Sequence, residues 1–84
     1  MNVGDFEDAV WAKDGIRIVI RARRATQVGD FDWANAAPEG QSLTVYMRNR
    51  IRARIDSHDF SVIDGRGSEP HGRTLLRNVR QSYR

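Results

Sequence analysis

The residues best suited to chemistry lie in one glycine-rich loop near the C-terminus. An apolar run ends at Ile63, and the next residues read Asp64-Gly65-Arg66-Gly67-Ser68-Glu69-Pro70-His71-Gly72-Arg73-Thr74. Glycine lets a backbone approach an anion closely, and amides, hydroxyls and guanidinium groups are donors that bind phosphate or carboxylate. The pattern therefore predicts an anion-binding loop between a strand and a helix.

The second half of this loop has the spacing of a Walker A motif. Residues 67–74 place two glycines, a basic residue and a threonine as that motif does, and over these positions the chain resembles the P-loop NTPases. The resemblance implies phosphate binding by the loop and a Thr74 hydroxyl on magnesium. However, Arg73 stands where the motif has lysine, and Pro70 removes an amide donor. Too little chain follows Thr74 for the further strands of a nucleotide site, so we expect no enzymatic activity.

A simpler anion site remains at residues 72–74. At a helix start, Gly72, Arg73 and Thr74 would offer free amides, a guanidinium and a hydroxyl to an anion. The alternative is a tight connection in which the glycines serve backbone geometry and Asp64 or Glu69 pairs with an arginine. The sequence is compatible with both interpretations.

Other catalytic and metal-binding patterns are missing from the sequence. His58 and His71 are the two histidines, and neither has a second ligand at a spacing typical of a metal site. The chain has no cysteine, which excludes a thiolate zinc site, a disulfide framework and a cysteine nucleophile. We therefore predict neither a metal nor a cofactor.

Positive charge is concentrated in the second half of the chain. Residues 1–43 hold five basic and seven acidic residues, a net charge of −2, whereas residues 44–84 hold nine and four, a net charge of +5. Thirteen of the fourteen basic residues are arginine, which binds phosphate bidentately, although a GC-rich genome would produce the same bias. The basic half is the predicted contact for a polyanion. The residues expected to form it, with Gly72 and Thr74, are Arg48, Arg52, Arg66, Arg73, Arg77, Arg80 and Arg84.

The elements that would position this surface begin with a predicted β-hairpin. Residues 6–11 are rich in apolar side chains, residues 13–15 supply a turn, and residues 16–24 alternate between apolar and polar side chains. Residues 25–41 have no period and predict a loop or a short edge strand. On the alternating strand, the side chains expected to face the core are Ile16, Ile18, Ile20 and Ala22, opposite Arg17, Val19, Arg21 and Arg23.

The second half predicts two helices and one more strand. Ser42 fits the N-cap of a helix, although Arg50 and Arg54 interrupt its apolar face. That helix would end near Arg52, or the two arginines would extend past the edge of the core. Residues 60–63 predict a short strand. From Thr74 onward, a helical face is expected to carry Leu75, Leu76, Val79 and Tyr83.

Together these elements predict one α+β domain over residues 1–84. Its order is β-β-α-β-α, with two helices packed on one face of a short, mostly antiparallel sheet. A chain of this length supports a single core. The acidic N-terminal segment and the lack of cysteine or of a long apolar run predict a cytoplasmic protein with no membrane partner.

We expect a small non-enzymatic binding module whose arginine-rich C-terminal half contacts nucleic acid or a nucleoprotein assembly. The aromatic residues are not interleaved with the arginines, and no signature of a groove-reading fold is present, so binding would depend on charge and shape. The alternative is a protein–protein inhibitor or adaptor, like the small accessory proteins of phages and mobile elements that block a host enzyme or defence complex. Arginine is enriched at such interfaces too.

Overall fold

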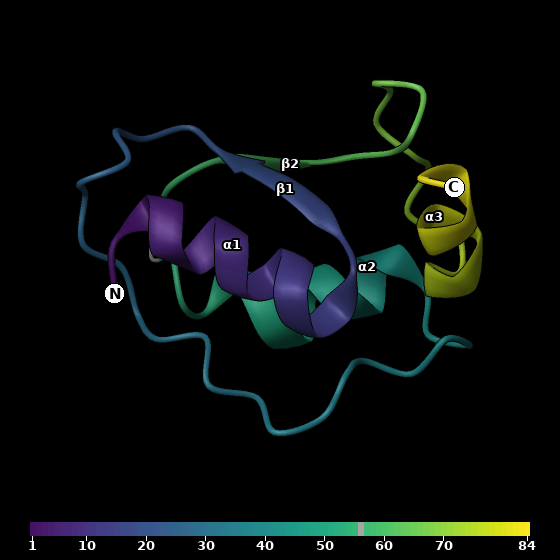
Figure 1. Cartoon of the computed structure of the whole chain (residues 1–84), viewed down its shortest axis with the longest axis horizontal. Helices are drawn as coiled ribbons and strands as arrows, with labels where there is room; N and C mark the ends of the chain where they lie inside the picture. Colours follow the sequence, from purple (N-terminus) through teal and green to yellow (C-terminus); the bar gives the residue numbers. More distant parts are fainter. Residues whose placement is uncertain (56) are drawn as a thin grey trace.

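Three α-helices and one antiparallel strand pair make up the fold in the computed structural model, which describes residues 1–55 and 57–84 (Figure 1). The helices are α1 (Val3–Asp14), α2 (Leu43–Tyr46) and α3 (Leu76–Ser82), and α2 continues as a π-helix, η1 (Met47–Arg52). The strands are β1 (Arg17–Ile20) and β2 (Phe60–Ile63). This is an α+β composition, as predicted, but the order of the elements differs. No helix in the described residues is long and apolar enough to span a membrane.

The prediction of a strand over residues 6–11 is wrong, because this segment lies inside α1. Asn2 caps the helix by accepting a hydrogen bond from the Asp5 amide at 2.8 Å. Gly15 ends it in the left-handed region, with φ of 65°, and donates its amide to the Trp11 carbonyl. Val3, Phe6 and Val10 are all buried, at the spacing of one helical face. The predicted first β-hairpin is therefore a helix followed by a strand.

The strand pair has the facing that its sequence predicts. β1 and β2 are antiparallel, with Arg17 opposite Ile63 and Ile20 opposite Phe60. Ile16, Ile18 and Ile20 are buried in the core, whereas Val19 is 47% exposed, so the alternation is confirmed as far as Ile20. The expected continuation of the strand to residue 24 is wrong, because β1 ends at Ile20 and Ala22 is half-buried outside it.

The helix after Ser42 also begins and ends where expected. The Ser42 hydroxyl accepts a hydrogen bond from the Val45 amide, and the regular structure ends at Arg52. Tyr46 and Ile51 lie five residues apart and are both fully buried. A π-helical turn closes with i to i+5 hydrogen bonds, so it brings residues at this spacing onto one face. The π-helical geometry thus keeps this face of η1 in the core.

A long loop over residues 21–42 wraps around one side of the molecule, as Figure 1 shows. The loop expected over residues 25–41 is confirmed, since this segment contains no helix or strand and only an isolated bridge from Gln27 to Asn2. Phe31 anchors the loop by packing edge-on against Phe6, with ring centroids 5.3 Å apart.

The connection from β2 to α3 is held tightly against α3. The Gly65 amide donates to the Ser82 hydroxyl at 2.8 Å, and a Cβ on Gly65 would lie 1.6 Å from the Ser82 carbonyl oxygen. Tyr83 adds a second link, because its hydroxyl accepts from the Arg17 amide and donates to the Ile63 carbonyl. The apolar face predicted for this helix is confirmed for Leu76 and Val79, which are fully buried, whereas Leu75 and Tyr83 are half-buried at its two ends.

Candidate nucleic-acid interface

The first half of the glycine-rich loop binds a carboxylate that belongs to the protein itself. The amides of Arg66 and Ser68 donate to the same Asp64 carboxylate oxygen, at 2.9 and 3.0 Å, and the Gly67 amide donates to the Asp64 carbonyl. Gly67 adopts a φ of 79°, which glycine tolerates without strain. These amides are occupied by Asp64, so they form no cradle for a phosphate.

Residues 72–74 cap the start of α2. The carbonyls of Gly72 and Thr74 accept from the Thr44 and Leu43 amides at 2.9 and 2.8 Å. Such acceptors satisfy the unpaired amides at the start of a helix.

The predicted helix start at Thr74 is wrong, since α3 begins at Leu76. The Arg73 and Thr74 amides instead donate to the ring nitrogen and carbonyl of His71. The local geometry corresponds to the tight connection, although neither Asp64 nor Glu69 forms an ion pair with an arginine in the described residues.

Three arginines serve the interior of the fold, and one of them belongs to the predicted contact. Arg80 donates from Nε to the Asp14 carbonyl at 2.7 Å and from a terminal nitrogen to the Ala37 carbonyl at 2.8 Å. Arg50 and Arg54 likewise bond groups of the long loop. The two hydrogen bonds of Arg80 hold its side chain half-buried beside α1, whereas Arg66, Arg73, Arg77 and Arg84 are exposed.

Asp14 is the buried centre of a polar network that the sequence does not reveal. Its carboxylate is fully buried and accepts from Arg50 at 3.0 Å, from the Ala37 amide at 2.8 Å and from the Tyr46 hydroxyl at 2.8 Å. Burial, reinforced by the Asp14 charge, raises the pKa of Tyr46 far above its ordinary value. The sequence predicts a turn at Asp14. The signal for its role was Arg50, an arginine on an apolar helix face that needs a buried carboxylate.

Trp33 contacts both arginines that interrupt the apolar face of the helix after Ser42. The guanidinium groups of Arg50 and Arg54 lie 4.5 and 5.0 Å from the centroid of the Trp33 ring. Arg54 also pairs with Asp32 and holds the pKa of that carboxyl below its ordinary value. Arg50 therefore holds the long loop to η1, and Arg54 holds it to the turn that follows η1.

Four exposed arginines belong to α3, the residues directly after it and the loop that precedes it, and these segments form one end of the molecule (Figure 1). None of them forms an ion pair with a residue in the described ranges. A hydrogen bond from the Gly65 amide to the Ser82 hydroxyl joins this loop to α3. We name this set the C-terminal arginine surface; it consists of Arg66, Arg73, Arg77 and Arg84.

The remaining predicted contacts lie outside this set. Arg48 is exposed on η1, one turn beyond Thr44, which is bonded to Gly72. Arg52 lies with its guanidinium 5.2 Å from the centroid of the Phe60 ring, at the start of β2, away from the α3 end. The structure thus brings together part of the predicted set and places Arg52 away from it. Arg80 lies near Arg84 but donates its hydrogen bonds to backbone carbonyls.

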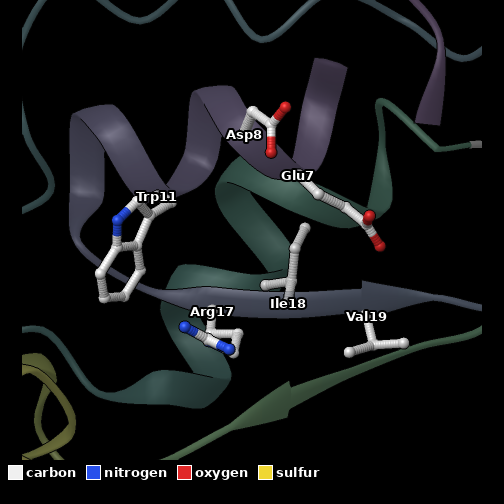
Figure 2. A pocket seen from close by; sticks show the side chains of 6 residues that line it. All are labelled: Glu7, Asp8, Trp11, Arg17, Ile18 and Val19. Atoms are coloured by element: carbon white, nitrogen blue, oxygen red, sulfur yellow. The ribbon is translucent and has the colours of Figure 1, made fainter. Parts of the chain in front are cut away.

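Trp11 lines two hollows of opposite character. One has a volume of about 390 Å³ and lies between α1 and β1, with the Glu7 and Asp8 carboxylates on its helix side; we name it the acidic hollow. Figure 2 shows these side chains and Trp11 opposite Arg17, Ile18 and Val19 of β1. The other, the basic hollow, has a volume of about 310 Å³ and is lined by Trp11, Gly15, Arg80, Tyr83 and Arg84.

Within residues 1–55 and 57–84, no three histidine or acidic side chains are placed to hold a metal ion together. Comparison of the chain with known protein families, with curated proteins and with solved structures finds no match.

Proposed function

We propose that the protein is a non-enzymatic nucleic-acid-binding module that contacts the phosphate backbone through its C-terminal arginine surface. One observation carries the proposal. The fold uses Arg50, Arg54 and Arg80 internally, whereas the arginines of the C-terminal surface are exposed at one end without ion pairs in the described residues. A cluster of exposed arginines without ion pairs is typical of a phosphate-binding surface.

The charge distribution supports the same orientation of binding. The half of the chain that builds this end has a net charge of +5, and the other half has a net charge of −2. A polyanion is attracted to positive charge, so it would contact residues of the basic half, which includes α3 and the loop before it. Exposed contacts of this kind are screened by salt, so affinity should fall as salt is raised.

The test is a titration of labelled duplex and single-stranded DNA at several salt concentrations. Arg73 and Arg77 are exposed, and neither side chain forms a hydrogen bond with another described residue, so replacing both with glutamine should leave the melting temperature unchanged. Losing two phosphate contacts should lower the salt slope by about 1.4 to 1.8.

Arg23→Gln is the matched control, because Arg23 is an exposed arginine in the 21–26 segment, at the opposite end of the molecule from α3 (Figure 1). Its binding and salt slope should equal those of the wild type. Absence of binding by the wild type, or binding that ignores salt, contradicts the proposal.

A second candidate, a protein–protein inhibitor or adaptor, is favoured by the acidic hollow. Val19 and Trp11 expose 47% and 45% of their surface there, beside the carboxylates of Glu7 and Asp8. Exposed apolar side chains rimmed by charge are typical of protein interfaces. A partner captured after nuclease treatment by the wild type, and lost with Val19→Asp, would support this function. Retention of that partner by Val19→Asp would exclude this hollow as its contact.

A further inference from the structure

We propose that Trp11 and Tyr83 form a stacking site in the basic hollow for an unpaired base of single-stranded nucleic acid. The inference rests on the proposed function and specifies its ligand, because only a strand with unpaired bases can use such a site. The sequence separates Trp11 from the C-terminal arginines by most of the chain, and the fold brings them together.

The aromatic surface is exposed and held in place. Trp11 is 45% exposed, and its ring meets the Tyr83 ring edge-on, with centroids 5.2 Å apart and planes at 79°. The Tyr83 hydroxyl is fixed between the Arg17 amide and the Ile63 carbonyl. A preorganised aromatic surface loses little conformational entropy when a base stacks on it.

Positive charge lines these rings on the side of the basic hollow, whereas Glu7 and Asp8 lie on the side of the acidic hollow. The Arg17 guanidinium lies 5.4 Å from the centroid of the Trp11 ring, and Arg80 and Arg84 line the hollow. Arg80 is fixed by backbone carbonyls rather than by a carboxylate, so these contacts leave its charge unneutralised. Aromatic rings flanked by cations are the combination that proteins use for single strands, with bases on the rings and phosphates on the cations.

The location favours an unpaired base over a duplex. Bases in a duplex are stacked on one another and present their edges, whereas a base from a single strand can present its face to an aromatic ring. The volume of about 310 Å³ lies at the lower end of the range for small-ligand pockets. Arg84 belongs to both the basic hollow and the C-terminal arginine surface, so one strand can occupy both.

The experiment compares binding of labelled oligothymidine and of a duplex by wild-type protein, Trp11→Ala, Trp11→Phe and Val19→Ala. Trp11→Ala should weaken binding of the single strand by about 5- to 150-fold, the range measured for loss of one stacked base, and leave duplex binding unchanged. Trp11→Phe keeps an aromatic face and should retain most of the affinity. Val19→Ala, an exposed apolar residue of the acidic hollow, should bind like the wild type.

The outcomes separate this inference from the proposed function. If the wild type binds both nucleic acids in a salt-dependent way and Trp11→Ala weakens neither, or weakens both equally, the stacking site is wrong and the arginine surface stands. An equal loss with Trp11→Phe also contradicts stacking. If the wild type binds neither nucleic acid, both proposals are wrong. Circular dichroism melting of each variant identifies any loss of affinity that results from unfolding.

Discussion

At the scale of single residues, the Asp14 and Arg50 pair is the contact whose loss should cost most. The carboxylate is fully buried and the Arg50 side chain is 12% exposed, so water cannot solvate either charge well if its partner is removed. Asp14→Asn should lower the free energy of unfolding by about 3 to 5 kcal/mol. Asp30→Asn is the control, because this carboxylate is 72% exposed and pairs with the N-terminus, and it should change stability by less than about 1 kcal/mol. Similar losses in both variants, measured by urea unfolding, would contradict a structural role for the buried pair.

Tyr46 should make the protein sensitive to alkali. Its pKa is raised above the ordinary value of 10.0 by burial and by Asp14. Above that pH the unfolded chain loses the tyrosine proton while the folded protein keeps it, so unfolding releases a proton. The free energy of unfolding should then fall by about 1.4 kcal/mol per pH unit for this residue. Tyr46→Phe should be less stable at neutral pH, because Asp14 loses a donor, but should show a shallower alkaline slope; an unchanged slope would exclude Tyr46 as the source.

At the scale of elements, the turn chemistry and the apolar patterns predicted much of the second half of the chain. Ser42 as N-cap, the strand over residues 60–63 and the buried side of the last helix were all recoverable from local signals. Residues 6–11 alone have the pattern of a short apolar strand, and this pattern conceals the first helix. Asn2 and Gly15, which cap the helix, are the residues that indicate it in the sequence.

The joint between β2 and α3 is the element on which the arginine surface depends. A Cβ on Gly65 would collide with the backbone of Ser82, which cannot move aside as a flexible side chain could. Gly65→Ala should therefore separate the loop from α3, lower the melting temperature and disperse the arginines. A Cβ on Gly40 would meet nothing within 4 Å, so Gly40→Ala is the matched control and should leave both melting and nucleic-acid binding unchanged. If Gly65→Ala melts at the temperature of the wild type, the close contact between Gly65 and the Ser82 backbone is contradicted.

At the scale of the whole molecule, the fold divides the arginines between two tasks that the sequence cannot distinguish. Arg80 has the helical spacing of Arg73, Arg77 and Arg84, yet its contacts with Asp14 and Ala37 depend on segments far away in the chain. The composition of the second half correctly predicted that positive charge would be exposed there. It could not predict which arginines remain exposed, or that Trp11 from the acidic half would lie beside Arg84.

The contiguity of the basic hollow and the C-terminal arginine surface makes a prediction about strand length. A short oligothymidine can fill the hollow but contacts few of the four exposed arginines, so its binding should depend weakly on salt. Longer strands should bind more tightly and with a steeper salt slope. When all four arginines contact phosphates, this surface should contribute about 2.8 to the salt slope. The molecule measures 30 × 26 × 21 Å, so it can contact only a short length of strand. Beyond that length, the affinity and the salt slope of the one-to-one complex should stop rising. Arg84→Gln should reduce the gain with length, since Arg84 connects the two areas. Fluorescence anisotropy over a length series measures both quantities, and an affinity independent of length would show that the hollow and the arginine surface do not bind one strand together.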